Sequence, residues 1–308
     1  MYRFLIVVLV VVTGCGPAPV PAVGDDRIDS GTSAVDAGGI TPSDAGRATD
    51  AGAMSDAGQI EVDAGLPRCT FYDGKVNCPP VITPVLSRDV YWQSPSGRAP
   101  AAGFPAIIVY QGSFFAPSST WGEVSGSMLY GGFQQARMQA LMLERGYTVI
   151  APSAIAGLAW QTNSGLPWDT TNDKPFIDAV LGGMRTGTFG PIDMTHLYAT
   201  GISSGGYMTS RMAVSYPGVF RALIIHAGSY ANCSGVACFV PTTMPARHPP
   251  TRFLHGRADL TVPLYTAEAY ADRLRMQGFE TDLIIDDAAG HEWLSTSPER
   301  ILEWVQAH

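Results

Sequence analysis

One pentapeptide of this chain has the residue types and spacing of a nucleophile. Gly201-Ile202-Ser203-Ser204-Gly205 reads G-x-S-x-G, the pattern of a turn that holds a serine between a strand and a helix with its hydroxyl exposed. The outer glycines are needed because a Cβ beside this strained turn would meet the backbone. The run His196–Thr200 predicts the strand, and apolar residues at helical spacing over 205–215 predict the helix. These flanks favour a nucleophilic Ser203 over a glycine-rich loop without chemistry.

Asp259 and His291 are the candidate partners of this serine. A serine needs a base that takes its proton, and the base needs a third group that fixes its tautomer. In α/β-hydrolases the acid and then the histidine follow the nucleophile along the chain. Asp259 comes after the predicted strand Thr251–Leu254, and His291 comes after the predicted strand Thr281–Asp286. Because such residues gather at the carboxyl edge of a parallel sheet, we expect a catalytic triad of Ser203, Asp259 and His291.

Other acidic and histidine side chains compete for these two roles. Asp286 and Asp287 are the alternatives for the acid, but they share one loop with His291, whereas a triad acid usually comes from another strand. His226 and His255 end predicted strands but precede the acid in the chain. The sequence therefore predicts packing or supporting roles for these two histidines.

Acyl transfer also needs hydrogen-bond donors for the oxyanion that forms. One expected donor is the backbone N–H of Ser204, which follows the nucleophile. The other is the N–H of Ser113, in the loop after the predicted strand Ala106–Tyr110, where Gly112 allows a close approach of the backbone. Aromatic residues on the same rim predict an apolar cleft suited to an uncharged ester. The expected substrate contacts are Phe114, Trp160, Trp168 and Trp293.

Short apolar runs alternate with helical patterns through the second half of the chain. This alternation predicts an α/β fold with a mostly parallel central sheet and helices on both faces. The expected strands are 89–93, 106–110, 147–152, 196–200, 221–226, 251–254 and 281–286. The expected helices are 133–144, 174–184, 205–215, 263–276 and 298–306.

Residues 1–15 have the pattern of a lipoprotein signal peptide. Arg3 precedes the apolar stretch Phe4–Val12, which is too short to cross a bilayer, and small residues then lead into Cys15. This end resembles the lipobox of bacterial lipoproteins, in which the cysteine is acylated. The resemblance implies an exported protein that a lipid at Cys15 anchors to a membrane. The alternative is an ordinary secretory signal with an incidental cysteine.

Residues 16–66 form a tether in which Asp-Ala-Gly recurs and large apolar side chains are scarce. Such a segment is expected to be disordered and to span roughly 40 Å. Its nine acidic and two basic residues account for most of the net charge of −8. The remaining domain, 67–308, is close to neutral, which excludes nucleic acid as an expected partner.

The globular part contains four cysteines, Cys69, Cys78, Cys233 and Cys238. An even count in an exported protein predicts disulfides. Three connectivities are open, of which the two local pairs are the simplest. The spacings C-x8-C and C-x4-C, without a nearby histidine, do not fit a zinc site. The sequence shows no P-loop, dinucleotide fingerprint or metal motif, so no metal and no cofactor are expected.

The residues from Gly201 to Met208, with the loops of Asp259 and His291, resemble exported polyhydroxyalkanoate depolymerases. Ile202 and Ser204, with the close triad spacing, are most similar to the medium-chain-length, poly(3-hydroxyoctanoate) enzymes. The resemblance covers about residues 85–308. It implies an α/β-hydrolase fold, hydrolysis of polyester bonds through an acyl-enzyme, and no cofactor.

By this resemblance, Ser203 is the nucleophile, His291 is the base and then the acid, and Asp259 orients the histidine. The implied partner is a hydrophobic polyester or its oligomers. An anchored front end departs from the family, whose members are generally released to reach a polymer outside the cell. The alternatives are a short-chain polyhydroxybutyrate depolymerase, a feruloyl or acetyl carbohydrate esterase, and a surface-anchored binding protein without activity. The sequence does not determine the oligomeric state.

Overall fold

A computed structural model describes residues 68–308 of the protein. The predictions for the signal peptide, Cys15 and the acidic tether lie outside the described residues. Within the described part of the chain, no helix has both the length and the apolar character needed to cross a bilayer.

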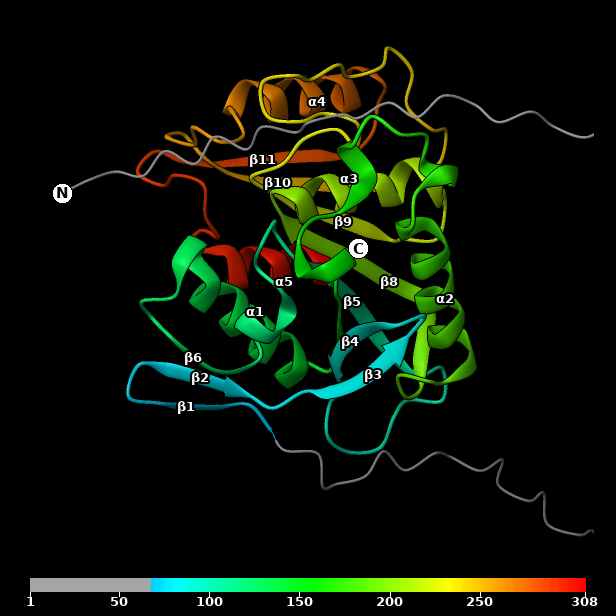
Figure 1. Cartoon of the computed structure of the whole chain (residues 1–308), viewed down its shortest axis with the longest axis vertical. Coiled ribbons are helices and arrows are strands. Elements are labelled where there is room, and N and C mark those ends of the chain that lie inside the picture. The colour runs from blue at the N-terminus through cyan, green and yellow to red at the C-terminus, as the bar shows by residue number, and fades with distance from the viewer. Residues whose placement is uncertain (1–67) are drawn as a thin grey trace, which may run out of the picture. The chain divides into compact units, whose positions relative to one another are not determined.

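An eight-stranded sheet forms the centre of the domain (Figure 1). Its order is β11-β10-β9-β8-β5-β7-β4-β3, and the six strands from β11 to β7 run parallel to one another. At one edge of the sheet, β4 pairs in the antiparallel sense with β7 and with β3. The strands are β3 (Val81–Val85), β4 (Arg88–Gln93), β5 (Phe104–Tyr110), β7 (Thr148–Pro152), β8 (Ile192–Ile202), β9 (Ala222–His226), β10 (Thr251–Gly256) and β11 (Thr281–Asp286). The predicted parallel sheet is confirmed.

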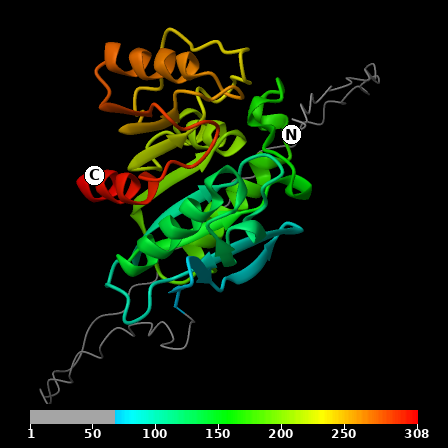
Figure 2. The same ribbon diagram turned by 90° about the vertical axis from the view of Figure 1, so that its left-hand side faces the viewer.

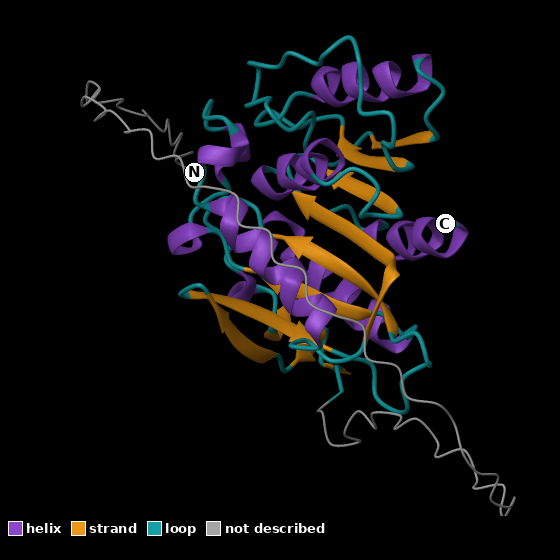
Figure 3. Cartoon of the chain, turned by 90° about the vertical axis from the view of Figure 1, so that its right-hand side faces the viewer, coloured by secondary structure: helices purple, strands orange, loops and turns teal. Residues whose placement is uncertain are grey.

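Helices cover both faces of this sheet, as Figure 2 and Figure 3 show. Alternate residues of β5 explain the two layers, because Ile107 and Val109 pack in one apolar core while Ile108 and Tyr110 pack in another. The first core includes α1 (Gly132–Glu144) and α5 (Ser297–Ala307). On the other face lie α2 (Asp173–Thr186), α3 (Ser204–Ser215) and α4 (Leu264–Met276). Each predicted helix is present, with ends shifted by one or two residues.

A small antiparallel sheet precedes and partly interrupts this pattern. It has the order β1-β2-β6 and contains β1 (Thr70–Tyr72), β2 (Lys75–Cys78) and β6 (Gly122–Ser125). A disulfide between Cys69 and Cys78 closes the β1–β2 hairpin, and a second joins Cys233 to Cys238. Both local pairs that the spacing favours are therefore present.

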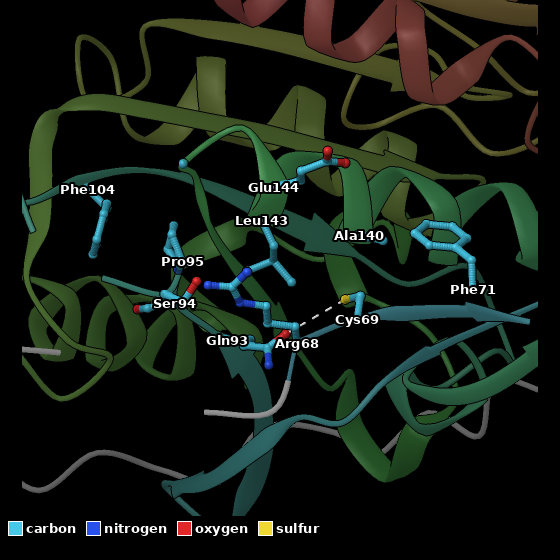
Figure 4. Close-up of a pocket in the computed structure, with 12 residues that line it drawn as sticks. Arg68, Cys69, Phe71, Gln93, Ser94, Pro95, Phe104, Ala140, Leu143 and Glu144 are labelled. Atoms are coloured by element: carbon cyan, nitrogen blue, oxygen red, sulfur yellow. Dashed lines mark hydrogen bonds between the residues drawn. The ribbon is translucent and has the colours of Figure 1, made fainter. Parts of the chain in front are cut away.

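The two edges of the parallel sheet differ in what they carry. A cavity of about 490 Å³ lies at the amino edge, where Phe104 begins β5 and Gly146 precedes β7 (Figure 4). The carboxyl ends of β5, β8, β10 and β11 face the opposite edge. Since ligands of such sheets bind beyond the carboxyl ends, the active site is expected at that edge rather than in the cavity.

Candidate active site

Ser203 lies at a sharp turn between β8 and α3. Its backbone has φ 58° and ψ −120°, a sparsely populated conformation for a residue with a side chain. The turn is held because its N–H donates a hydrogen bond of 3.1 Å to the carbonyl oxygen of His226. A Cβ on Gly201 would lie 2.6 Å from the carbonyl oxygen of Tyr110, and one on Gly205 would collide with the same atom. The geometry has the strand, strained serine and helix of a nucleophile elbow.

Asp259 and His291 meet beside this edge of the sheet. The Nδ1 atom of His291 lies 2.7 Å from Oδ2 of Asp259, whose side chain is fully buried. The other oxygen, Oδ1, accepts the backbone N–H groups of Thr261 and Val262, each at 2.8 Å. Burial by itself would raise the pKa of Asp259, but the hydrogen bonds from His291 and the two backbone groups outweigh it and lower this pKa. A carboxylate placed in this way holds a proton on Nδ1 and leaves Nε2 able to accept one.

The alternative acids, Asp286 and Asp287, form other contacts. Asp286 accepts the N–H groups of Ala288 and Ala289 and so closes the turn after β11. Asp287 is exposed and forms an ion pair of 2.6 Å with Arg257. Among the hydrogen bonds of residues 68–308, neither carboxylate reaches the imidazole of His291, so the geometry favours Asp259.

His226 and His255 are buried beneath the candidate triad. Burial lowers the pKa of both imidazoles below their ordinary value, so both are neutral at pH 7. Nε2 of His255 lies 2.8 Å from the carbonyl oxygen of Val262, to which it donates, and 3.5 Å from Oδ2 of Asp259. His226 is hydrogen-bonded to Ser297 at 2.8 Å. These contacts give the two histidines the supporting roles that the sequence predicts.

Two backbone N–H groups are available near Ser203 as oxyanion donors. Ser204 is the first residue of α3, where an N–H has no partner within the helix and the positive end of the helix dipole lies. Ser113 lies in the loop after β5, and its N–H has no hydrogen-bond acceptor among the described residues. The next N–H, of Phe114, is occupied by the carbonyl oxygen of Leu158 at 2.6 Å. The geometry is therefore compatible with the predicted donors.

Of the four aromatic residues predicted to contact the substrate, three are buried and one is exposed. Trp160, Trp168 and Trp293 are buried, with at most 9% of their surface exposed. Trp160 supports the site from within, because its backbone N–H donates to Oγ of Ser204 and its indole N–H to the carbonyl oxygen of Gln111. Trp293 packs on His226 with ring centroids 4.0 Å apart. The three rings pack in the apolar cores of the domain. Such buried rings do not fit the prediction that they contact the substrate. Only Phe114, 67% exposed, still fits that prediction.

Comparison with known proteins adds to this geometry. The model of the prolyl oligopeptidase family matches residues 134–235. A poly(3-hydroxyoctanoate) depolymerase of Pseudomonas fluorescens is 48% identical over 227 residues, which are 73% of this chain and 81% of the relative. The chain belongs to the poly(3-hydroxyoctanoate) depolymerase family. It is a carboxylic ester hydrolase.

Solved structures support the α/β-hydrolase fold of this chain. A thermostable esterase aligns with a TM-score of 0.55 and 17% identity, over 74% of this chain and 62% of its own. An acylaminoacyl peptidase bound to a chloromethyl ketone aligns with a TM-score of 0.52 and 17% identity. That match covers 74% of this chain but only 40% of the peptidase, so the chain spans less than half of that larger protein. At such identities the likeness shows the fold alone.

Sequence reasoning missed two residues that shape the depolymerase-like site. Gln111 joins the loop after β5 to a neighbouring loop, because its side chain donates to the carbonyl oxygen of Gly157 at 2.9 Å and accepts the N–H of Ala154 at 3.0 Å. Tyr130 packs edge-on against His291, with ring centroids 6.3 Å apart. Neither belongs to a motif. Only the fold could have revealed them, since both act across more than 40 residues.

Proposed function

We propose that this protein is a serine esterase that hydrolyses ester bonds of a medium-chain-length polyhydroxyalkanoate or its oligomers. The observation that carries the proposal is the 2.7 Å contact between His291 and a buried, ionised Asp259, at the sheet edge where a strained turn holds the half-buried Ser203. The poly(3-hydroxyoctanoate) depolymerase at 48% identity supports the choice of substrate. The exposed Phe114 beside the proposed oxyanion loop fits an apolar ester.

In the proposed mechanism, Oγ of Ser203 attacks the ester carbonyl while Nε2 of His291 takes its proton. Asp259 keeps the proton of His291 on Nδ1 and stabilises the imidazolium that forms. The N–H groups of Ser204 and Ser113 donate to the oxyanion of the tetrahedral intermediate. His291 then returns the proton to the leaving alcohol, and water hydrolyses the acyl-enzyme by the same steps.

Clearing of polyester films tests the substrate. We expect the protein to clear a film of poly(3-hydroxyoctanoate) faster than one of polyhydroxybutyrate, with soluble hydroxyacid oligomers as the product. Rates on feruloyl and acetyl sugars serve as the comparison, because those are the substrates of the alternative esterases. Activity confined to such sugars would reject the polyester substrate while leaving the ester chemistry in place. Preference for polyhydroxybutyrate would reject only the side-chain length.

We further propose that the mature protein begins at an acylated Cys15 and that residues 16–66 tether the catalytic domain to a membrane. Removing the acylation site should release the exported protein. We expect Cys15→Ala to shift the protein from the membrane fraction to the soluble fraction of cells, with the specific activity of the soluble enzyme retained. Cys69→Ala is not a suitable control because Cys69 is in a disulfide, so Ser30→Ala in the tether is the matched one. Membrane association that survives Cys15→Ala would refute the lipid anchor.

A further inference from the structure

Four large apolar side chains are exposed on two loops and on helix α4 beside Asp259. Leu260 is 95% exposed, Phe239 79% and Val236 73%, and Tyr265 of α4 is also exposed. We call these four residues the apolar knob. None has a charged side chain. The charged groups that flank Asp259 on the same edge, Arg257 and Asp287, neutralise each other in an ion pair.

The part of the knob that contains Val236 and Phe239 is fixed by covalent and polar contacts. The disulfide between Cys233 and Cys238 closes the loop that Val236 tops, and Phe239 follows directly. The N–H of Gly235 donates to the hydroxyl of Tyr207 at 3.1 Å. The disulfide and this hydrogen bond restrain the backbone of the loop, while Val236 and Phe239 remain exposed to solvent.

Leu260 is held outward by the same carboxylate that orients His291. Asp259 accepts the N–H groups of Thr261 and Val262, which closes a turn with Leu260 at its tip. The turn adjoins the disulfide loop, since a Cβ on Gly235 would lie 3.4 Å from the carbonyl oxygen of Thr261. The disulfide loop also contacts α4, because Tyr265 donates its hydroxyl hydrogen to the carbonyl oxygen of Val236 at 3.3 Å. The four residues thus lie on connected segments next to the candidate triad.

An apolar surface of this kind gains free energy when it leaves water. Its ordering entropy on binding is small because its loops are already fixed. A water-insoluble polyester is an uncharged, apolar solid, and its ester bonds must come to the edge of the sheet where Ser203 lies. The described part of the chain is a single layered domain without a separate binding module, so contact with a solid has to use the surface of this domain.

We propose that the apolar knob is the surface by which the protein adsorbs to solid polyester. The inference rests on the proposed function, because it requires a polymer substrate. Adsorption through the knob brings polymer chains alongside the loop of Asp259 and so raises their concentration near the nucleophile.

Adsorption can be measured without hydrolysis in a Ser203→Ala background. The probe is a suspension of poly(3-hydroxyoctanoate) particles, and bound protein is determined as a function of free protein. We expect the combined Val236→Ser, Phe239→Ser and Leu260→Ser variant to bind at least about tenfold more weakly, since each substitution removes a large apolar contact. The matched control is Phe71→Ser with Leu86→Ser, two exposed apolar residues on other elements, and its binding should be unchanged.

The same substitutions are then made in the active protein, and the film-clearing rate of each variant is divided by its rate on a soluble chromogenic ester. This ratio should fall for the knob variant and stay constant for the control. If the parent clears films and the knob variant binds particles as tightly as the Ser203→Ala protein, the inference is overturned while the proposed function stands. If the parent hydrolyses soluble esters but clears no film, the polyester function itself fails. A dimer in sedimentation that the knob substitutions dissociate would assign the knob to a second copy and overturn adsorption.

Discussion

Replacing Ser203 with alanine is expected to lower kcat on a chromogenic ester by at least about 10³-fold. The substitution removes the atom that forms the acyl-enzyme, while the oxyanion donors and the rest of the site stay in place. The turn should remain folded, because its hydrogen bonds use the backbone N–H and carbonyl oxygen of Ser203. The close approach of the backbone at Gly201 and Gly205 is also unchanged. Steady-state kinetics with thermal unfolding of the same preparation measures both effects.

Ser215→Ala at the far end of α3 is the control for this substitution. It makes the same chemical change at the opposite end of α3, away from the elbow, and should leave kcat within about twofold. Turnover retained by Ser203→Ala would reject the assignment of the nucleophile. An absence of ester turnover in the parent protein, with polyester binding intact, would instead favour the binding protein without activity.

The sequence was sufficient for the parts of the fold that local patterns encode. The run before Ser203 and the helical spacing after it predicted β8 and α3, and the chain order predicted that Asp259 and His291 would meet. These predictions rest on rules that act over a few residues or on the parallel alternation of strands and helices. The observed contact of 2.7 Å between the two side chains agrees with them.

Other features depend on packing that no local pattern contains. Trp293 stands two residues after His291 in the chain, yet its ring is directed into the core against His226. The sequence pattern of an aromatic residue on a loop is the same whether its ring faces the substrate or the core. The position of a residue in the sequence does not give the direction of its side chain. The short strands β1, β2, β3 and β6 were missed for a related reason. They have few residues, and β6 pairs with β2 only through a contact across more than 40 residues.

Replacing Asp259 with asparagine is expected to lower kcat/KM by about 10³- to 10⁴-fold, with little loss of stability. Oδ1 accepts the N–H groups of Thr261 and Val262, and the amide oxygen of asparagine can keep those bonds. Only the atom that faces His291 changes, from an acceptor to a donor. The amide then favours the tautomer with the proton on Nε2, which cannot take the proton of Ser203.

The pH dependence of this variant provides an independent check. Burial alone would raise the pKa of Asp259, but the interaction with His291 and the backbone hydrogen bonds together outweigh it, so the folded environment lowers this pKa. A carboxyl with a lowered pKa stays ionised above its ordinary pKa of about 4 and loses its charge only at more acid pH. The deficit of Asp259→Asn relative to the parent should therefore persist from about pH 5 to about pH 9, rather than vanish on the acid side.

Asp287→Asn is the matched control because Asp287 is the rival acid of the sequence and is exposed in an ion pair with Arg257. We expect kcat/KM to change by less than about twofold, since an exposed pair contributes little and does not reach His291. Equal losses in the two variants would mean that the carboxylate facing His291 is not the one on the loop after β10. A large loss in Asp287→Asn alone would transfer the role to the loop of His291 itself, and the buried carboxylate would then serve only to hold the turn that carries Leu260.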